Sequence, residues 1–368
     1  MGKAICELFT NSEKGTKWLE GKALSMPPTL AEVAKRAGVS LATASRVLNG
    51  DGKRVVDGRM RESVIAAAEE LNYVPNAHAQ ALARSESTAV GAIVHDVSDP
   101  YFSEIVRGIQ RVSADAGRLV TICNSYRDPA RELEYVRLLR SQRVGAIIMT
   151  GSGLDDRDYS QSLGAQIHAF ADLGGRTIFI GRHHVAGDAV IPDNVGGARS
   201  LGEALLDLGH RDIAVISGPD VLTTTRDRLD GLRQAFSARR VVLDERSIVA
   251  GDFSRDSGVA AARELWERSK TFTAIAALND EMAIGALSAL RELGIDVPRQ
   301  VSIIGFDDIP AARDVTPALS TIRIPLIEMG ARAMTIALQP GGSQLTIEHF
   351  TAELVLRDST RRISGRKQ

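Results

Sequence analysis

A run of small and hydroxyl side chains around a single arginine is the part of this sequence whose residue types point most directly to a chemistry. Residues 40–49 read SLATASRVLN, with Ala44, Val47 and Leu48 at the spacing of one inner helical face. The outer face carries Arg46 among alanine, threonine and serine. That face is poor for a protein core, because it lacks large apolar side chains. It suits a flat, polar and negatively charged partner.

Double-stranded DNA is such a partner. An arginine can form two hydrogen bonds with one guanine, and a small apolar side chain can pack against a thymine methyl group. Arg46, Leu41 and Ala42 are therefore our candidates for base contacts. Short polar side chains nearby can position the helix without reading sequence, mainly through phosphate. These further candidates are Thr29, Ser40, Thr43, Ser45 and Asn49. The alternative is that Leu41 packs on a neighbouring helix and Arg46 pairs with an acid.

Two further helical patterns flank this segment and would position it. The first occupies residues 30–37, where Thr29 and Glu32 have the spacing of a capping box and Gly38 ends the helix. The second begins near residue 58. Its inward residues are Met60, Val64, Ala67, Ala68 and Leu71. Two helices joined by a short turn containing glycine, followed by a third helix, predict a helix-turn-helix unit.

Composition limits the remaining choices. The 368 residues are enough for two or three domains, and 44% hydrophobic with 25% charged residues is the composition of a globular protein. No apolar run reaches the ~18 residues of a membrane span, and two cysteines make no disulfide framework. The net charge is −1, and residues 26–85 hold eight Lys/Arg against six Asp/Glu, a weakly basic balance that a dimer would double.

The N-terminal extension, residues 1–27, lacks the apolar core of a signal peptide. We expect it to be disordered, and both a natural arm and a true start at Met26 stay open. A cytoplasmic protein without a membrane partner is therefore expected.

From about residue 88 the rhythm changes to short apolar runs that alternate with amphipathic helices. Two such series follow each other, which predicts two lobes with parallel sheets covered by helices on both faces. Ligands of such sheets lie beyond the carboxyl ends of the strands. Polar and aromatic residues at those ends are Asp96, Ser98, Asp99, Asn124, Thr150, Arg182, Phe253, Asn279, Asp280, Asp307 and Asp308.

Several linked motifs in the same order make the chain resemble the lactose/galactose-repressor family of bacterial transcription regulators. They include TLAEVAKRAGVSLATASRVLNG, LNYVPNAHAQALA, DPYFSEIVRGI, NDEMAIGALSALRELGIDVPRQVSIIGFDDIP and LVLRDST, and they cover about residues 28–360. The resemblance implies an α/β fold class: an all-helical helix-turn-helix DNA-binding domain plus a two-lobed, periplasmic-binding-protein-like effector domain of doubly wound parallel sheets, with three crossovers between the lobes.

The resemblance also implies domain boundaries. The DNA-binding domain takes residues 28–74, a hinge helix and linker 75–87, the effector domain 88–360 and a short tail 361–368. Within the effector domain, lobe one takes about 88–188 plus 320–339, and lobe two about 190–317 plus 343–360.

The segment PNAHAQALA matches the family's hinge helix, which is too short to be stable alone. By resemblance, Leu82 wedges between base steps of the minor groove, and Asn76 and Ala79 line that groove. The plainer alternative is that Leu82 is an ordinary apolar residue of a helix.

The resemblance assigns further residues to an effector pocket. Arg228 matches a ligand-clamping arginine, and Asp280 matches an acid that accepts hydrogen bonds from the ligand. The remaining candidates are Asp96, Tyr101, Phe102, Arg182, Phe253 and Asn279. Phe102 in the core and Asp280 as a helix cap are the alternatives. A neutral sugar or polyol is the expected effector.

Other classes of function fit less well. The sequence has no GxSxG, P-loop or HExxH motif, so we expect no enzyme activity and no cofactor, and the pair His183-His184 lacks further metal ligands. A sugar-binding transport protein is the alternative, but it leaves residues 29–85 unexplained. We expect a homodimer that binds an operator. A small molecule bound between the lobes would change the lobe angle and with it the affinity for DNA. Effector identity, the sign of its action and the operator stay open.

Overall fold

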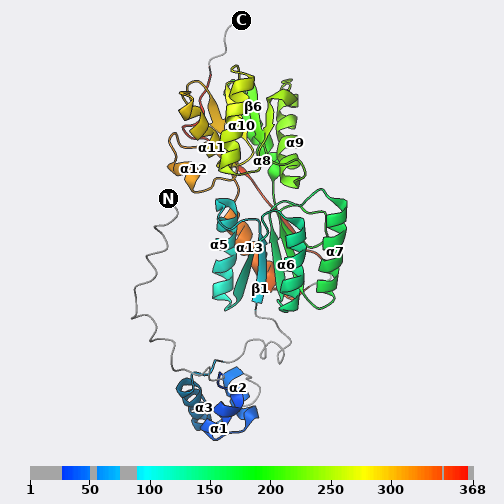
Figure 1. Cartoon of the computed structure of the whole chain (residues 1–368), viewed down its shortest axis with the longest axis vertical. Coiled ribbons are helices and arrows are strands. Elements are labelled where there is room, and N and C mark those ends of the chain that lie inside the picture. Colours follow the sequence, from blue (N-terminus) through cyan, green and yellow to red (C-terminus); the bar gives the residue numbers. More distant parts are fainter. Residues whose placement is uncertain (1–26, 50–55, 75–88, 342–343, 364–368) are drawn as a thin grey trace, which may run out of the picture. The chain divides into compact units, whose positions relative to one another are not determined.

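The structure is a computed structural model that describes residues 27–49, 56–74, 89–341 and 344–363. The chain divides into two compact units, Met1–Glu86 and Ser87–Gln368 (Figure 1). Among the described helices none combines the length and the apolar character that crossing a membrane requires.

In the described part of the first unit, α1 (Leu30–Ala37), α2 (Leu41–Asn49) and α3 (Gly58–Glu70) pack into one cluster. The predicted capping box is present at the start of α1, and Gly38 ends that helix with φ of 67° in the left-handed region. The buried side chains of the cluster are Val33, Ala34, Ala44, Val64, Ala67 and Ala68. This small core fixes α2 against α1 and α3.

The prediction that Met60 is buried is wrong. Its side chain is 50% exposed, although Val64, one turn later, is fully buried. Met60 lies in the first turn of α3, and the core that α1 and α2 provide begins only at Val64. Helical periodicity predicts which face of a helix points inward, but it does not predict how far along the helix the neighbouring helices extend.

The second unit begins with a six-stranded parallel sheet in the order β11-β5-β4-β3-β1-β2. Its strands are β1 (Ala89–Val94), β2 (Leu119–Asn124), β3 (Ala146–Thr150), β4 (Arg176–Ile180), β5 (Asp188–Pro192) and β11 (Ile347–Phe350). Helices α5 (Pro100–Asp115) and α13 (Leu326–Leu338) pack on each other, as do α6 (Pro129–Ser141) and α7 (Arg157–Ala171). Alternate residues of one strand belong to different cores, since Ile148 packs with the α5 side and Ile147 with the α6 side. Both faces of the sheet are therefore covered, as the sequence predicts.

A second parallel sheet has the order β7-β6-β8-β9. Its strands are β6 (Ile213–Ser217), β7 (Ile248–Ala250), β8 (Ala274–Ala277) and β9 (Ser302–Ile304). Helices α8 (Asn194–Asp207) and α9 (Thr223–Ala238) pack together, and so do α10 (Arg255–Arg268) and α11 (Asp280–Glu292). The short elements η2 (Glu245–Ser247) and α12 (Ala311–Asp314) complete this lobe.

The chain passes between the two sheets three times. It leaves the first sheet after β5, returns after β10 (Thr321–Arg323) to form α13, and leaves again between β11 and β12 (Glu353–Val355). Strands β10 and β12 form an antiparallel pair that contacts α8. Three crossovers match the family resemblance.

The lobe boundaries differ from those predicted. Residues 343–360 were assigned to lobe two, but β11 within them pairs with β5 in the first sheet. Strand β5 itself spans residues 188–192 and so runs across the boundary placed near 188–190. The physical reason is that β5 would otherwise lie at the edge of the sheet. Strand β11 supplies hydrogen-bond partners for the free backbone groups of β5.

Candidate nucleic-acid interface and ligand pocket

Helix α2 turns its predicted contact face away from the core of its own unit. Ala44 is fully buried, whereas Leu41 is 54% exposed and Ala42 is exposed too. Arg46 is half-buried and forms no ion pair with any of the residues that the structure describes. The structure therefore does not support packing of Leu41 or an acid partner for Arg46, and their base contacts stay predictions.

The hydroxyl groups near α2 already have partners within the protein. Ser40 Oγ accepts a hydrogen bond from the backbone N–H of Thr43 at 3.1 Å and lies 2.9 Å from Thr43 Oγ1. Thr29 Oγ1 donates to Glu32 Oε2 at 3.0 Å. These contacts belong to the N-terminal caps of α1 and α2, so a DNA phosphate would have to share the same hydroxyl groups.

Other predicted DNA contacts are placed only in part. Ser45 is half-buried on α2, and the backbone of Asn49 forms the last residue of that helix. The hinge candidates Asn76, Ala79 and Leu82 lie outside the described residues.

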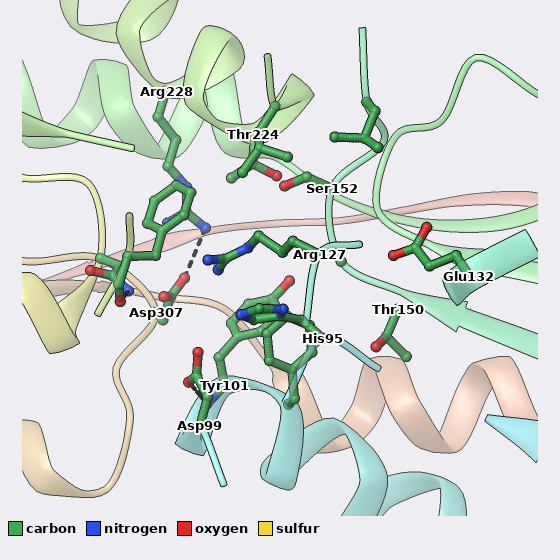
Figure 2. A pocket seen from close by; sticks show the side chains of 16 residues that line it. His95, Asp99, Tyr101, Arg127, Glu132, Thr150, Ser152, Thr224, Arg228 and Asp307 are labelled. Atoms are coloured by element: carbon green, nitrogen blue, oxygen red, sulfur yellow. Dashed lines mark hydrogen bonds and ion pairs between the residues drawn. The ribbon is translucent and has the colours of Figure 1, made fainter. Parts of the chain in front are cut away.

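The second unit contains a pocket beyond the carboxyl ends of its strands, lined from both lobes (Figure 2). The lining residues are His95, Asp99, Tyr101, Phe102, Arg127, Glu132, Thr150, Gly151, Ser152, Leu154, Leu222, Thr224, Arg228, Phe253, Asn279 and Asp307. The pocket thus brings together five of the predicted effector residues. They are Tyr101, Phe102, Arg228, Phe253 and Asn279.

Arg228 on α9 is the most extensively held side chain of the pocket. Its Nε donates to Asn194 Oδ1 at 2.9 Å, one Nη group donates to the carbonyl of Leu278, and the other donates to Asp307 Oδ1 at 2.8 Å. The guanidinium carbon lies 3.7 Å from the centre of the Phe306 ring. These contacts fix the planar group, which borders the pocket, in one orientation.

Asp307 is one of the strand-end residues noted in the sequence, but it was not among the predicted effector residues. It follows β9, lies buried with φ of 112°, and pairs with Arg228. Burial raises the pKa of Asp307 to about 7, and the adjacent Arg228 guanidinium opposes that rise. Its place at a strand end was the available signal, but that signal applied equally to Asp280.

Aromatic side chains from lobe one form a second wall. The Phe102 ring meets His95 and Tyr101 edge to face, with ring centres 5.7 and 5.0 Å apart. Burial, helped by the charge of Arg127, lowers the pKa of His95 to about 4, so the imidazole is neutral at pH 7. Its buried Nδ1 has no hydrogen-bond partner within the described part of the chain. Apolar faces beside single polar atoms are typical of small-molecule sites.

Arg127 and Phe253 meet across the two lobes. Both residues have left-handed backbones, with φ of 57° and 72°. Arg127 follows β2, and its Nη1 donates to the carbonyl of Asp252 at 2.6 Å, while its guanidinium lies 5.3 Å from the Phe253 ring centre. Asn279 Nδ2 donates to the Phe253 carbonyl at 2.9 Å and holds that loop.

Glu132 on α6 closes the far side of the pocket. Its carboxylate accepts hydrogen bonds from Tyr159 Oη and from Ser125 Oγ, the latter at 3.0 Å. Burial raises the pKa of Glu132, and the two hydroxyl donors counter that rise. Glu132 was not predicted from the sequence, because it lies inside a helix and not at the end of a strand.

Three predicted effector residues do not line the pocket. Arg182 forms two hydrogen bonds with Asp227, at 3.0 and 2.6 Å. Asp280 is buried, accepting from Thr321 Oγ1 at 2.6 Å and from the backbone N–H of Ile309. Asp96 Oδ1 accepts from the backbone N–H of Ser98 at 2.9 Å. Each of these side chains is held by the protein itself, and Asp280 in particular serves the interior and not the cavity.

Comparison with known proteins now identifies the architecture. Residues 29–76 match the family described as bacterial regulatory proteins, lacI family, and residues 203–360 match a periplasmic binding protein-like domain. The transcriptional regulator GalS of Salmonella typhimurium is 37% identical over 336 residues, which cover 90% of this chain and 96% of GalS. The chain belongs to the LacI family. It is therefore a DNA-binding transcriptional regulator, and the fold class predicted from its sequence is confirmed.

Further members of the LacI family support this assignment. The regulator DegA of Bacillus subtilis is 34% identical, with 91% of this chain and 98% of DegA covered. Among solved structures, the lac repressor dimer bound to operator and an anti-inducer has a TM-score of 0.81 at 29% identity, covering 91% of this chain and 99% of that one. A complex of the regulator CelR with cellobiose has a TM-score of 0.66, also at 29% identity.

Proposed function

We propose that the affinity of this LacI-family regulator for its operator is controlled by a small hydroxylated molecule that binds between the two lobes. The observation that carries the proposal is the pocket itself, because Arg228 and Asp307 come from one lobe and His95 and Phe102 from the other. A ligand that contacts both walls binds one relative orientation of the lobes more tightly than others. It therefore shifts the equilibrium between orientations.

The chemistry of the pocket supports a sugar-like ligand. Aromatic faces such as Phe102 and Phe253 suit the apolar C–H surface of a sugar, and the paired Arg228 and Asp307 offer donors and an acceptor for neighbouring hydroxyls. Cellobiose in the CelR complex is a ligand of this class. We propose that this protein binds its ligand without transforming it.

Coupling to DNA requires a dimer in this proposal. A twofold pair of chains would place two copies of α2 on a pseudo-palindromic site, with Arg46, Leu41 and Ala42 at base edges. A change of lobe angle in each chain would alter the distance between the two hinge segments, and with it the operator affinity. The lac repressor structure with a similar fold is itself a dimer bound to operator.

Operator selection followed by fluorescence anisotropy tests the proposal. Bound sequences are selected from a random duplex library with the full chain, and the affinity of the best duplex is then measured with and without each ligand that binds. We expect a change of at least tenfold, which corresponds to ~1.4 kcal/mol of coupling. An operator affinity that does not respond to any bound ligand would contradict the proposal.

The variant Leu82→Ala tests the hinge contact within the same assay. We expect weaker binding to the selected operator and little change on random DNA, because wedging acts only in the specific complex. Equal losses on both DNAs would reject that role for Leu82.

A further inference from the structure

Arg127 differs from Arg228, the other arginine of the pocket, in that no carboxylate of the described residues forms an ion pair with it. A guanidinium has five N–H donors, and the described residues receive only one of those of Arg127, at the carbonyl of Asp252. No carboxylate of the described residues pairs with it. By contrast, Arg228 has Asp307 at 2.8 Å and two further acceptors.

The acids that line the same pocket do have partners. Asp307 is paired with Arg228, and Glu132 accepts from two hydroxyl groups. Asp99 accepts from the backbone N–H of Tyr101 at 2.9 Å and caps α5. None of these carboxylates pairs with Arg127, so this guanidinium is left without an anionic acceptor among the described residues.

The surroundings of Arg127 favour such an acceptor. Burial lowers the pKa of Arg127, and the charges of Asp99 and Asp252 partly offset this effect. A half-buried guanidinium without a paired carboxylate keeps donors for a ligand, and a bound anion would supply the paired charge. Figure 2 shows Arg127 reaching into the middle of the pocket between Arg228 and His95.

Neutral donors around Arg127 would complete such a site. Ser152 and Thr224 line the pocket, and neither hydroxyl forms a side-chain hydrogen bond with the described residues. These hydroxyls can donate or accept, whereas the N–H groups of Arg127 that have no partner among the described residues can only donate. A ligand rich in acceptors at one end matches this arrangement.

We infer that the effector is an anionic sugar derivative, an oxyanion on a hydroxylated carbon chain, and that Arg127 is the residue that binds the oxyanion. The inference rests on the proposed function and makes it more specific, because it replaces the neutral sugar expected from the sequence. A planar guanidinium fits both a carboxylate and a phosphate through two parallel hydrogen bonds. The experiment below separates these two sources of charge.

Matched ligands test the inference on the full chain. Thermal shift and then isothermal titration calorimetry compare galactose with galacturonate and galactose 6-phosphate, and glucose with glucuronate, gluconate and glucose 6-phosphate. We expect at least one anion to bind at least tenfold more tightly than its neutral parent. Preference within the anions then assigns the charge to a carboxylate or to a phosphate.

Variants tie that preference to one side chain. In Arg127→Gln the affinity for the anion should fall at least tenfold. Arg127→Lys keeps the charge but not the two parallel N–H donors, so its affinity should lie between those of Arg127→Gln and the original chain. Arg131→Gln is the matched control, because Arg131 lies over the Tyr126 ring at 5.5 Å and does not line the pocket. Its affinity should stay within twofold of the original, and circular dichroism verifies that each variant is folded.

Three results would overturn the inference: a neutral parent that binds as tightly as its acid and phosphate, a panel in which no anion binds, or an unchanged anion affinity in Arg127→Gln. If Arg127→Gln does not fold, Arg127→Lys provides the decisive comparison. A neutral sugar that alters operator affinity would refute the anion while leaving the proposed function intact. An anion that binds through Arg127 but never alters operator affinity would support the anion site and contradict the proposed function.

Discussion

Replacing Arg228 with leucine should destabilise the second unit strongly even without any ligand. The change removes the donors of Asn194 Oδ1, the Leu278 carbonyl and Asp307 Oδ1, and leaves a buried carboxylate without its cation. Each buried acceptor left unsatisfied costs about 1–3 kcal/mol, but the side chain borders a cavity that water can enter. Breaking one side of a buried ion pair costs about 3–5 kcal/mol, and we expect the lower end of that range.

Urea unfolding followed by tryptophan fluorescence measures this cost. Trp266 packs edge to face on Phe272 in lobe two, and a Trp18→Phe background leaves it as the sole tryptophan. The double variant R228L/D307N removes the charge from both partners, so its loss should be smaller than that of R228L alone. A loss below about 1 kcal/mol in R228L, or a larger loss in the double variant, would refute the role assigned to this ion pair.

The pH dependence of the same variant has a definite sign. Without Arg228 nothing opposes the burial that raises the pKa of Asp307, so the folded chain binds a proton more readily than the unfolded chain. The penalty is present above that raised pKa and shrinks as the pH falls through it. The difference in unfolding free energy between R228L and the original chain should therefore be smaller at pH 5.5 than at pH 8.

Three further predictions concern other parts of the chain. Arg46→Ala should weaken binding to the selected operator by about 1–3 kcal/mol and random DNA far less, in anisotropy titrations with Arg46→Lys as the control; equal effects would reject a base contact. Thr29→Ala should cost the first unit about 1 kcal/mol through loss of the α1 cap, measured by amide hydrogen exchange; unchanged exchange would show that the cap contributes nothing. Burial lowers the pKa of His95 and of His183 to about 4, so both are neutral in the folded chain while the unfolded chain takes up protons below about pH 6.5. The contribution of these two histidines to stability should therefore fall between pH 6.5 and 4, so a His95→Asn/His183→Asn variant should lose less stability over that range than the original chain; an equal loss in both chains would contradict this account.

Much of the fold follows from patterns that are local in the sequence. The capping box of Thr29 and Glu32, the turn at Gly38 and the outward face of α2 all depend on residues a few positions apart. The alternation of apolar runs and amphipathic helices likewise gives two lobes with parallel sheets. These features are predictable because their causes lie within one or two turns of chain.

The pocket was less predictable, because its membership depends on partners distant in sequence. Asp280 and Asp307 both follow buried strands, but Asp280 is held by Thr321, 41 positions away, and only Asp307 reaches the cavity. Arg182 is captured by Asp227, 45 positions away. Arg127 enters the pocket because its backbone is left-handed, a conformation that its residue type does not suggest.

The position of β11 at the edge of the first sheet has a consequence for biosynthesis. A ribosome delivers β5 early, whereas the strand that pairs with it, Ile347–Phe350, emerges only near the end of translation. Until then the β5 edge offers unpaired backbone groups to any nascent neighbour on the same messenger. The sheet of lobe one can therefore be completed only near the end of translation, although most of its strands come early in the chain.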